Sequence, residues 1–500
     1  MAHIDEPLEA PSGAKAFLIL AAVFVAALML VRRTGQDTTL QAQLVVLALL
    51  VLPAYIMAQA DSKYLVPYLV FVWAVAPEAR RIVDWMQGGF HPQSYIAVAP
   101  ILATASLVIP VFRQRIIVPV LLYKALASIA LAVGYAGIVG YIRNETPAVF
   151  EFGGTVSPLL VLLYASGRPM EPKERDFWVM SIVYVALGVA AYGVIQYVYA
   201  PSWDTMWMRA VGREFIAIGR PEPYEIRVFS TFGSPLQCSL FLLTALVPML
   251  VEPKWRKLVG FAGAAFIAYV LLLTITRTAW VAMAAGVAAY VFVSQFARRV
   301  QVLAVILVLG AGIWFALPYL PGYEMISERV TGMTNLSEDT SMTARTAILR
   351  TFWDTIVSNP IGSGMGTYGV ATRLAADPRR RNTGFDNGYI GLADSYGWFG
   401  LLMFLRGLWL LVQSVREYRL DPERDRFVRL SIAMMVSYAV YTGSAYGAGV
   451  FVLLLGIALP FGIPKVEPNA APEPMFLDAA QPLRPRRVPT PQTARIGKAR

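Results

Sequence analysis

The chain has 500 residues, of which 57% are hydrophobic and 15% charged, and its formal net charge is +11 at pH 7. Soluble proteins carry about 25% charged residues, so this composition excludes an ordinary soluble protein and predicts an all-α polytopic membrane protein. The basic residues are not gathered on one polar domain, which argues against nucleic acid as a partner. One cysteine, Cys238, and two histidines, His3 and His91, exclude an intrachain disulfide and argue against a zinc site.

A helix needs roughly 20 apolar residues to cross the hydrocarbon core of a membrane, and apolar runs of about this length recur along the whole chain. We predict about 12–14 transmembrane helices from them. The run at 64–77 is short, and we interpret it as re-entrant or as paired with the charged stretch EARRIVDWMQGGFHPQSY. The predicted spans, in chain order, are 16–32, 40–59, 64–77, 94–112, 116–140, 147–165, 177–200, 231–251, 258–275, 278–296, 301–318, 387–413, 430–445 and 447–463.

Two longer polar segments interrupt the spans, at 201–229 and 319–386. The predicted organisation is therefore the first part of a transmembrane bundle, a large loop, the last part of the bundle and a basic tail. Because the tail is rich in Pro and Arg and poor in apolar residues, we expect it to be disordered and cytoplasmic. These four parts cover 1–318, 319–386, 387–463 and 464–500.

The lysines and arginines of the short loops predict the orientation. Loops near 168–175, 254–257, 298–299 and 416–429 all fall on one side and are rich in basic residues, so this side is assigned to the cytoplasm. Both polar segments then face the periplasm, in a multi-pass protein of a bacterial inner membrane. Four arginines (Arg32, Arg33, Arg80 and Arg81) fall on the outer side in this count, which leaves the N-terminal third open.

The two outer segments contain many arginines and no lysine. The planar guanidinium donates two parallel hydrogen bonds to phosphate oxygens, which an ammonium group cannot do. This favours phosphate binding, although arginine is also the commoner basic residue throughout, at 35 against 8 lysines.

The large loop contains the stretch SEDTSMTARTAILRTFWDTIVSNPIGSGMG. Its apolar residues recur at steps of four, which predicts an amphipathic helix over 341–358 that ends at Asn359-Pro360. The glycines of IGSGMG are expected to provide tight turns and close backbone approach. Such a helix cannot span the membrane, so we interpret it as a cover over a cavity at the outer face.

Two arginines lie at the edges of apolar runs, Arg277 in LLLTITRTAWVAM and Arg227 in YEIRVFSTFGSP. Charged residues within membrane spans are costly and are often functional. The alternative is that each is an interfacial arginine that extends its charge to the lipid headgroups.

Four motifs then occur in one order: RVFSTFGSPLQCSLFLL, TITRTAW, ARTAILRTFWDTIVSNPIGSGMGTY and DNGYIGLADSYGWFGLLMFL. From about 155 to 445 the chain resembles the superfamily of O-antigen ligases and O-antigen or exopolysaccharide polymerases, which are membrane glycosyltransferases. The motifs are similar to that family's arginine at the start of a span, its Thr/Ser-Arg turn, its large periplasmic loop and its closing His-Asn-x-Tyr motif.

The resemblance implies a GT-C-like fold and an inverting, metal-independent glycosyl transfer without a cofactor. The donor would be a glycan on undecaprenyl diphosphate, and the active site would face the periplasm. Arg277 and Asp386 are the expected catalytic residues, and Arg227 and Arg345 would complete a diphosphate clamp with Arg277. Arg350 is expected either to assist or to lie on the solvated face of the loop helix.

The closing motif departs from the ligase pattern at Asp386, where ligases carry histidine as the proposed base. Asp386 would accept the proton of the acceptor or, alternatively, cap the following span. Asn387 and Tyr389 match the rest of the motif and are expected to bind substrate. Asp394 is interpreted as a structural carboxylate, and His91 as the one alternative base.

The missing histidine favours a polymerase of exopolysaccharide or O-antigen over a ligase of lipopolysaccharide biosynthesis. The acceptor would be a lipid-linked glycan for the polymerase and lipid A-core for the ligase; membrane lipids and other polysaccharide-assembly proteins are further expected partners. A transporter or flippase of lipid-linked oligosaccharide is the alternative from another class. We see no internal repeat and almost no charge near the middle of the spans, which argues against a carrier.

Overall fold

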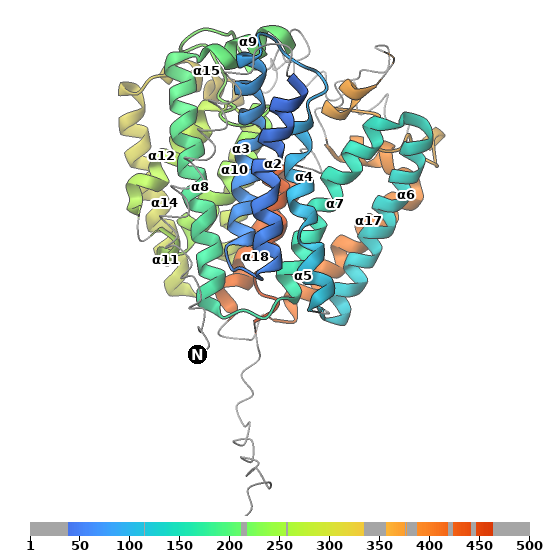
Figure 1. The fold of residues 1–500 in the computed structure, drawn as a ribbon. Helices are drawn as coiled ribbons and strands as arrows, with labels where there is room; N and C mark the ends of the chain where they lie inside the picture. Colours follow the sequence, from blue (N-terminus) through green and yellow to red (C-terminus); the bar gives the residue numbers. More distant parts are fainter. Residues whose placement is uncertain are drawn as a thin grey trace, which may run out of the picture. The chain divides into compact units, whose positions relative to one another are not determined.

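The computed structural model describes residues 39–114, 116–211, 218–256, 259–334, 357–375, 377, 388–418, 424–441 and 447–463. Within these ranges every regular element is a helix, apart from one isolated antiparallel bridge between Gly219 and Ile226 (Figure 1). The expected all-α polytopic class is therefore confirmed.

The first half of the bundle is built from helices that run back and forth beside one another (Figure 1). They are α2 (Thr39–Gln59), α3 (Leu65–Met86), η2 (Tyr95–Val98), α4 (Ala99–Ala105), α5 (Val108–Arg113), α6 (Val120–Asn144), α7 (Thr146–Gly167), α8 (Pro172–Tyr199), α9 (Ser202–Val211) and α10 (Pro235–Val251).

The second half completes the bundle and includes the described part of the large loop. Its elements are α11 (Pro253–Arg256), α12 (Gly260–Leu273), α13 (Arg277–Val293), α14 (Phe296–Ala316), η4 (Leu317–Tyr319), α15 (Tyr323–Thr334), η5 (Val370–Leu374), α17 (Gly388–Arg416), α18 (Asp425–Tyr441) and α19 (Ala448–Ala458). α6 packs against α17, α13 against α18, and α19 against both α7 and α10.

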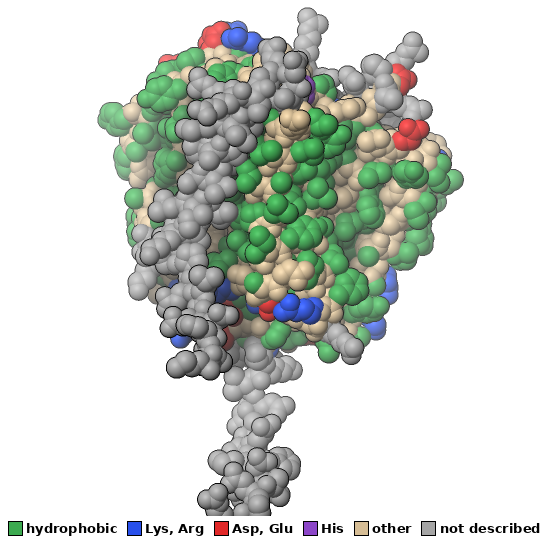
Figure 2. Space-filling model, viewed as in Figure 1, with side chains coloured by type: hydrophobic (Ala, Val, Ile, Leu, Met, Phe, Trp, Pro, Cys, Tyr) green, Lys and Arg blue, Asp and Glu red, His purple; other side chains and the backbone are tan. Residues whose placement is uncertain are grey.

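Seven of the described helical segments are long and apolar enough to cross a membrane. Four shorter apolar helices are also described: α10, α12 and α13, which lie between long segments in the chain, and α19, which follows the last of them. The predicted run 16–32 lies outside the described residues, so the range of 12–14 spans stays a prediction. Figure 2 shows the matching surface pattern, with hydrophobic side chains over the middle of the viewed face and charged ones towards its two ends.

The run 64–77 is joined to the first part of the charged stretch, in agreement with the second of its two interpretations. α3 is one helix of 22 residues that continues through Pro77 and ends at Met86. It continues because Glu78 and Arg81 are buried and paired with each other, and Arg81 also pairs with Asp204 on α9. Hydropathy alone counts these side chains as exposed charge, whereas the fold neutralises them inside the bundle.

The basic short loops meet at one end of the bundle, as their orientation pattern predicted. The carboxylate of Asp176 at the start of α8 accepts hydrogen bonds from Lys254, from Trp255 Nε1 at 2.9 Å and from Arg426 Nη2 at 2.9 Å. Arg168 pairs with Asp61 at the same end. We call this the basic end, and the end at which α9, α15 and η5 lie the loop end (Figure 1).

Asp176→Ala should lower the free energy of unfolding by about 1–3 kcal/mol, because it leaves the Trp255 donor and two cations without their shared acceptor. Thermal unfolding of the purified protein in detergent measures this. The control is Glu225→Ala, which removes an exposed ion pair with Arg220 and should cost less than about 0.5 kcal/mol. An Asp176→Ala protein that unfolds at the wild-type temperature would contradict the assignment of Asp176 as the centre of the basic end.

Candidate active site

Arg227 and Arg277, two of the predicted site arginines, meet at the turn between α12 and α13. The Arg227 guanidinium donates from Nε to the carbonyl oxygen of Thr274 at 3.3 Å, and from Nη2 to those of Thr274 and Ile275 at 3.2 Å each. The backbone N–H of Val228 donates to the carbonyl oxygen of Leu273 at 3.1 Å. The segment that carries Arg227 therefore caps the carboxyl end of α12, where the turn that leads to Arg277 begins.

Arg277 is the first residue of α13, a helix of 17 residues with no acidic side chain in its first turn. The amino end of a helix carries a partial positive charge, so a cation there is unfavourable for helix stability. The same position is favourable for binding an anion, because the backbone N–H groups of the helix end and the guanidinium can both donate hydrogen bonds to it. A choice of residue that costs stability is typical of a functional position.

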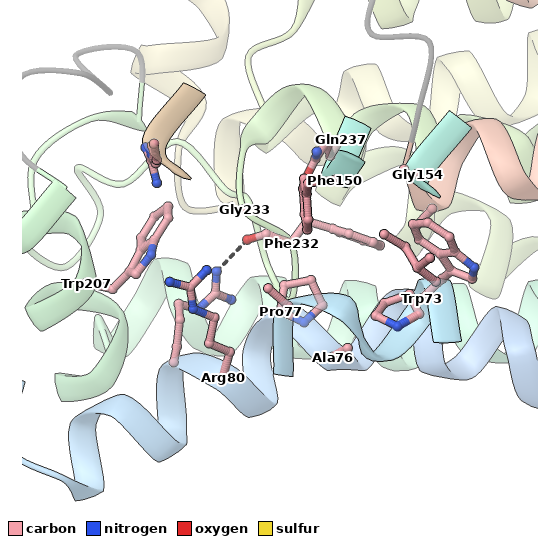
Figure 3. A pocket seen from close by; sticks show the side chains of 17 residues that line it. Trp73, Ala76, Pro77, Arg80, Phe150, Gly154, Trp207, Phe232, Gly233 and Gln237 are labelled. Atoms are coloured by element: carbon pink, nitrogen blue, oxygen red, sulfur yellow. Dashed lines mark hydrogen bonds between the residues drawn. The ribbon is translucent and has the colours of Figure 1, made fainter. Parts of the chain in front are cut away.

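The motif RVFSTFGSP connects this turn to a cavity of about 150 Å³ at the loop end. Arg227 lies at the turn, and Phe232, Gly233 and Gln237 line the cavity (Figure 3). Three helices contribute aromatic side chains to the lining as well: Trp73 of α3, Phe150 of α7 and Trp207 of α9. Arg373 of η5 lines the same cavity, so the large loop contributes to it.

A buried ion network forms one wall of the cavity. Arg81 pairs with Glu78, lies 2.9 Å from Asp204 Oδ1, and donates to the carbonyl oxygens of Ser230 and Phe232 at 2.5 Å each. Tyr192 OH lies 2.5 Å from Glu78 Oε1 and 2.8 Å from Asp204 Oδ2. The network thus fixes the backbone of residues 230–232. This segment lies between the cavity and the turn at 274–276, which we call the arginine turn.

The network was missed because its arginine was counted only as an orientation signal. Glu78 and Arg81 are three residues apart in a helical stretch, which places them on one face. Two opposite charges on one face of a long apolar helix are a readable signal for a buried pair.

Residues 357–375, called the glycine loop below, dock into a break in α17. Gly397 has φ +60°, so the helix is interrupted there, near the carbonyl oxygens of Asp394 and Ser395. The backbone N–H groups of Ser363 and Gly364 donate to them at 2.8 and 3.0 Å, and Trp398 N–H donates to Pro360 O at 2.9 Å. The loop therefore donates hydrogen bonds at the interruption of α17.

The close backbone approach predicted for IGSGMG is confirmed at Gly364. Its φ is +81°, and a Cβ atom there would lie 2.3 Å from the backbone nitrogen of Gly140 in α6. Asn144 at the end of α6 donates to the carbonyl oxygen of Met365 and to Thr367 Oγ1, both at 2.8 Å. Glycine is thus required where the loop backbone touches a helix backbone.

Asp394 and Glu151 hold this loop with their side chains. Asp394 is 1% exposed and accepts a hydrogen bond from Tyr368 OH at 2.8 Å. Burial and this bond to a carboxylate raise the pKa of Tyr368 above its ordinary value, so the hydroxyl keeps its proton and donates. Glu151 Oε2 accepts from Gly366 N–H at 2.7 Å. Asp394 fits the predicted structural role, whereas Glu151, a lone carboxylate inside the predicted span 147–165, was missed.

The other predicted site residues are only partly covered. Arg345, Arg350, Asp386 and Asn387 lie outside the described residues, as does most of the predicted helix 341–358, and their roles stay predictions. Tyr389 is described: its hydroxyl donates to the carbonyl oxygen of Ala439 and so ties the start of α17 to α18.

His91 lies at the loop end beside two charged residues of α3. Its Nδ1 is 3.4 Å from Asp84 Oδ1, and its carbonyl oxygen accepts from Arg80 Nη2 at 2.6 Å. Arg80 lines the cavity together with Arg373 (Figure 3 labels Arg80). The segment around His91 therefore reaches the same end as the large loop.

In the part of the chain that the structure describes, no group of three or more His, Cys, Asp or Glu side chains could hold a metal ion. The metal-independent mechanism stays a prediction.

Comparison with known proteins gives one match. The family described as O-antigen ligase matches residues 262–405, from α12 to the middle of α17. This range contains Arg277, the large loop and the closing motif, and it confirms the resemblance to the O-antigen ligase and polymerase superfamily there. Neither the curated proteins nor the solved structures gave a match to the chain.

Gly364→Ala should release the glycine loop from α6 and α17, because the added Cβ collides with the Gly140 backbone and disfavours the positive φ. We expect a loss of about 2–4 kcal/mol in the free energy of unfolding. Thermal unfolding and proteolytic sensitivity of the loop measure it. Gly312→Ala in α14, where a Cβ meets nothing within 4 Å, is the matched control. Equal behaviour of both variants would refute the docking role of Gly364.

Proposed function

We propose, from the O-antigen ligase domain at residues 262–405, that the protein transfers a glycan from undecaprenyl diphosphate to an acceptor hydroxyl at the periplasmic face, as a polymerase of exopolysaccharide or O-antigen. The observation that carries the proposal is the turn before α13, where Arg277 adds its charge to the positive end of a helix. A departing diphosphate needs fixed positive charge at this kind of position.

In the proposed reaction the acceptor oxygen attacks the anomeric carbon from the side opposite the diphosphate. The new bond from carbon to the acceptor oxygen forms as the bond from carbon to phosphate oxygen breaks, so the configuration inverts. The diphosphate leaves with the electron pair and is stabilised by Arg277, with Arg345 and Arg350 of the large loop as further ligands. The acceptor proton passes to the carboxylate of Asp386.

The cavity beside the turn supports a role in holding the sugars. Its lining combines aromatic faces, such as those of Trp73 and Trp207, with the polar groups of Gln237 and Arg373. Sites for small ligands are usually concave, largely apolar and furnished with a few polar groups that fix orientation. Asn387 and Tyr389 of the closing motif complete the proposed substrate contacts.

The acceptor distinguishes polymerase from ligase. We expect the purified protein to lengthen undecaprenyl-diphosphate oligosaccharide supplied alone, with products separated by size. Transfer that begins only when lipid A-core is added would select the ligase. If no transfer occurs and the lipid-linked glycan instead crosses the membrane of vesicles that contain the protein, the result would favour a transporter.

Arg277→Ala should lower kcat by about 10²- to 10³-fold, because one preorganised donor to the leaving group is lost. Arg277→Lys should recover only part of the activity, since an ammonium group cannot make the bidentate contact. Arg298→Ala at the basic end, which removes a pair with Glu252, is the control and should stay active. Wild-type amounts of surface polysaccharide in cells that express Arg277→Ala normally would contradict the proposal.

Asp386→Ala and Asp386→Asn should both lower kcat by about 10²-fold or more, because neither side chain can take the acceptor proton. If Asp386 only caps the following helix, Asp386→Asn keeps the cap and should remain active. The rates of the two variants with one donor measure the difference. Full activity in both would remove Asp386 from the mechanism.

A further inference from the structure

Ile275 lies in a backbone conformation that its side chain disfavours. Its φ is +53°, in the left-handed region, and its side chain is 5% exposed. A β-branched residue with positive φ is a genuine outlier, and such residues persist only where their surroundings hold them. Ile275 is the second of the three residues between α12 and Arg277, so its conformation sets the direction in which α13 starts.

The surroundings that hold Ile275 are the contacts of Arg227. The carbonyl oxygens of Thr274 and Ile275 belong to the two peptide groups on either side of the Ile275 Cα atom. Both accept from the same Arg227 guanidinium, at distances between 3.2 and 3.3 Å. Arg227 is itself fixed by its backbone N–H, which donates to Ile218 O at 3.0 Å.

These contacts also decide what else the guanidinium can bind. A guanidinium has two edges that can make a bidentate contact, Nε with Nη2 and Nη1 with Nη2, and both include Nη2. The two hydrogens of Nη2 correspond to its two bonds, one to Thr274 O and one to Ile275 O. Both bidentate edges of Arg227 are therefore engaged with the backbone of the turn.

We propose that Arg227 is a positioning residue: it holds the left-handed turn at Ile275 and thereby sets the place of Arg277, and it is not a direct ligand of the diphosphate. This rests on the proposed function for the role of Arg277. It revises the predicted three-arginine clamp, in which Arg227 touches the donor.

The test uses a suppressor at position 275. Arg227→Gln should lower kcat by about 10-fold or more, with the KM for the lipid-linked donor changed less than about 3-fold, because the bound donor is kept while Arg277 is displaced. Glycine has no penalty for positive φ, so adding Ile275→Gly should restore about 5- to 10-fold of the lost rate. Ile275→Ala removes nearly the same side chain without that freedom and is the matched control, so it should restore nothing.

Two results overturn the positioning role. One is an equal rate in the two double variants, and the other is a rise in KM for the donor with kcat unchanged. If Arg227→Gln gives no cooperative thermal transition in detergent, the same pair of comparisons is made with Arg227→Lys, whose single ammonium can reach one carbonyl oxygen. The proposed function fails separately, through an active Arg277→Ala variant in which Arg227 is intact.

Discussion

The last carbonyl groups of a helix have no hydrogen-bond donor within that helix. Inside a membrane bundle water does not supply the missing donors, so other parts of the protein must do so. At both ends of the O-antigen ligase match the donors come from distant segments. Arg227 and Val228 satisfy the carboxyl end of α12, and Ser363 and Gly364 satisfy the break in α17. One cap joins the segment before α10 to the turn after α12, and the other joins the large loop to α17. The proposed site depends on this joining, because each of its parts is otherwise a short irregular segment.

Buried charge has a second, related role at the same end. Arg81 is 1% exposed, and its carboxylate and carbonyl partners come from α3, α9 and the segment 230–232. Removing a single partner from such a network leaves a buried charge uncompensated, so the network specifies one arrangement of these three elements. The network therefore forms a rigid wall between the arginine turn and the aromatic cavity. Rigidity of this kind is what a transfer reaction requires, since its rate depends on where the charges stand relative to the leaving group.

Local chemistry allowed the prediction of the features whose causes are local. The glycines of IGSGMG indicated close approach, and Gly364 lies against Gly140; TITRTAW indicated a turn, and Arg277 follows one. The sequence did not allow us to predict which distant residues would contact one another. Nothing in YEIRVF says that Arg227 will bind Thr274, because that contact depends on how α10 and α12 pack. The same reason explains why α3 was cut short at its charged residues and why Glu151, which finds a partner only in the docked glycine loop, was passed over.

The central claim is that Arg277 acts on the diphosphate of the donor. The most direct measurement compares the affinities of undecaprenyl diphosphate and undecaprenyl monophosphate, first for the wild-type protein and then for Arg277→Ala in the same detergent. The account predicts that the wild type prefers the diphosphate by about 10-fold or more, and that the variant loses most of this preference while binding the monophosphate nearly as before. A variant that keeps the full preference would contradict the account.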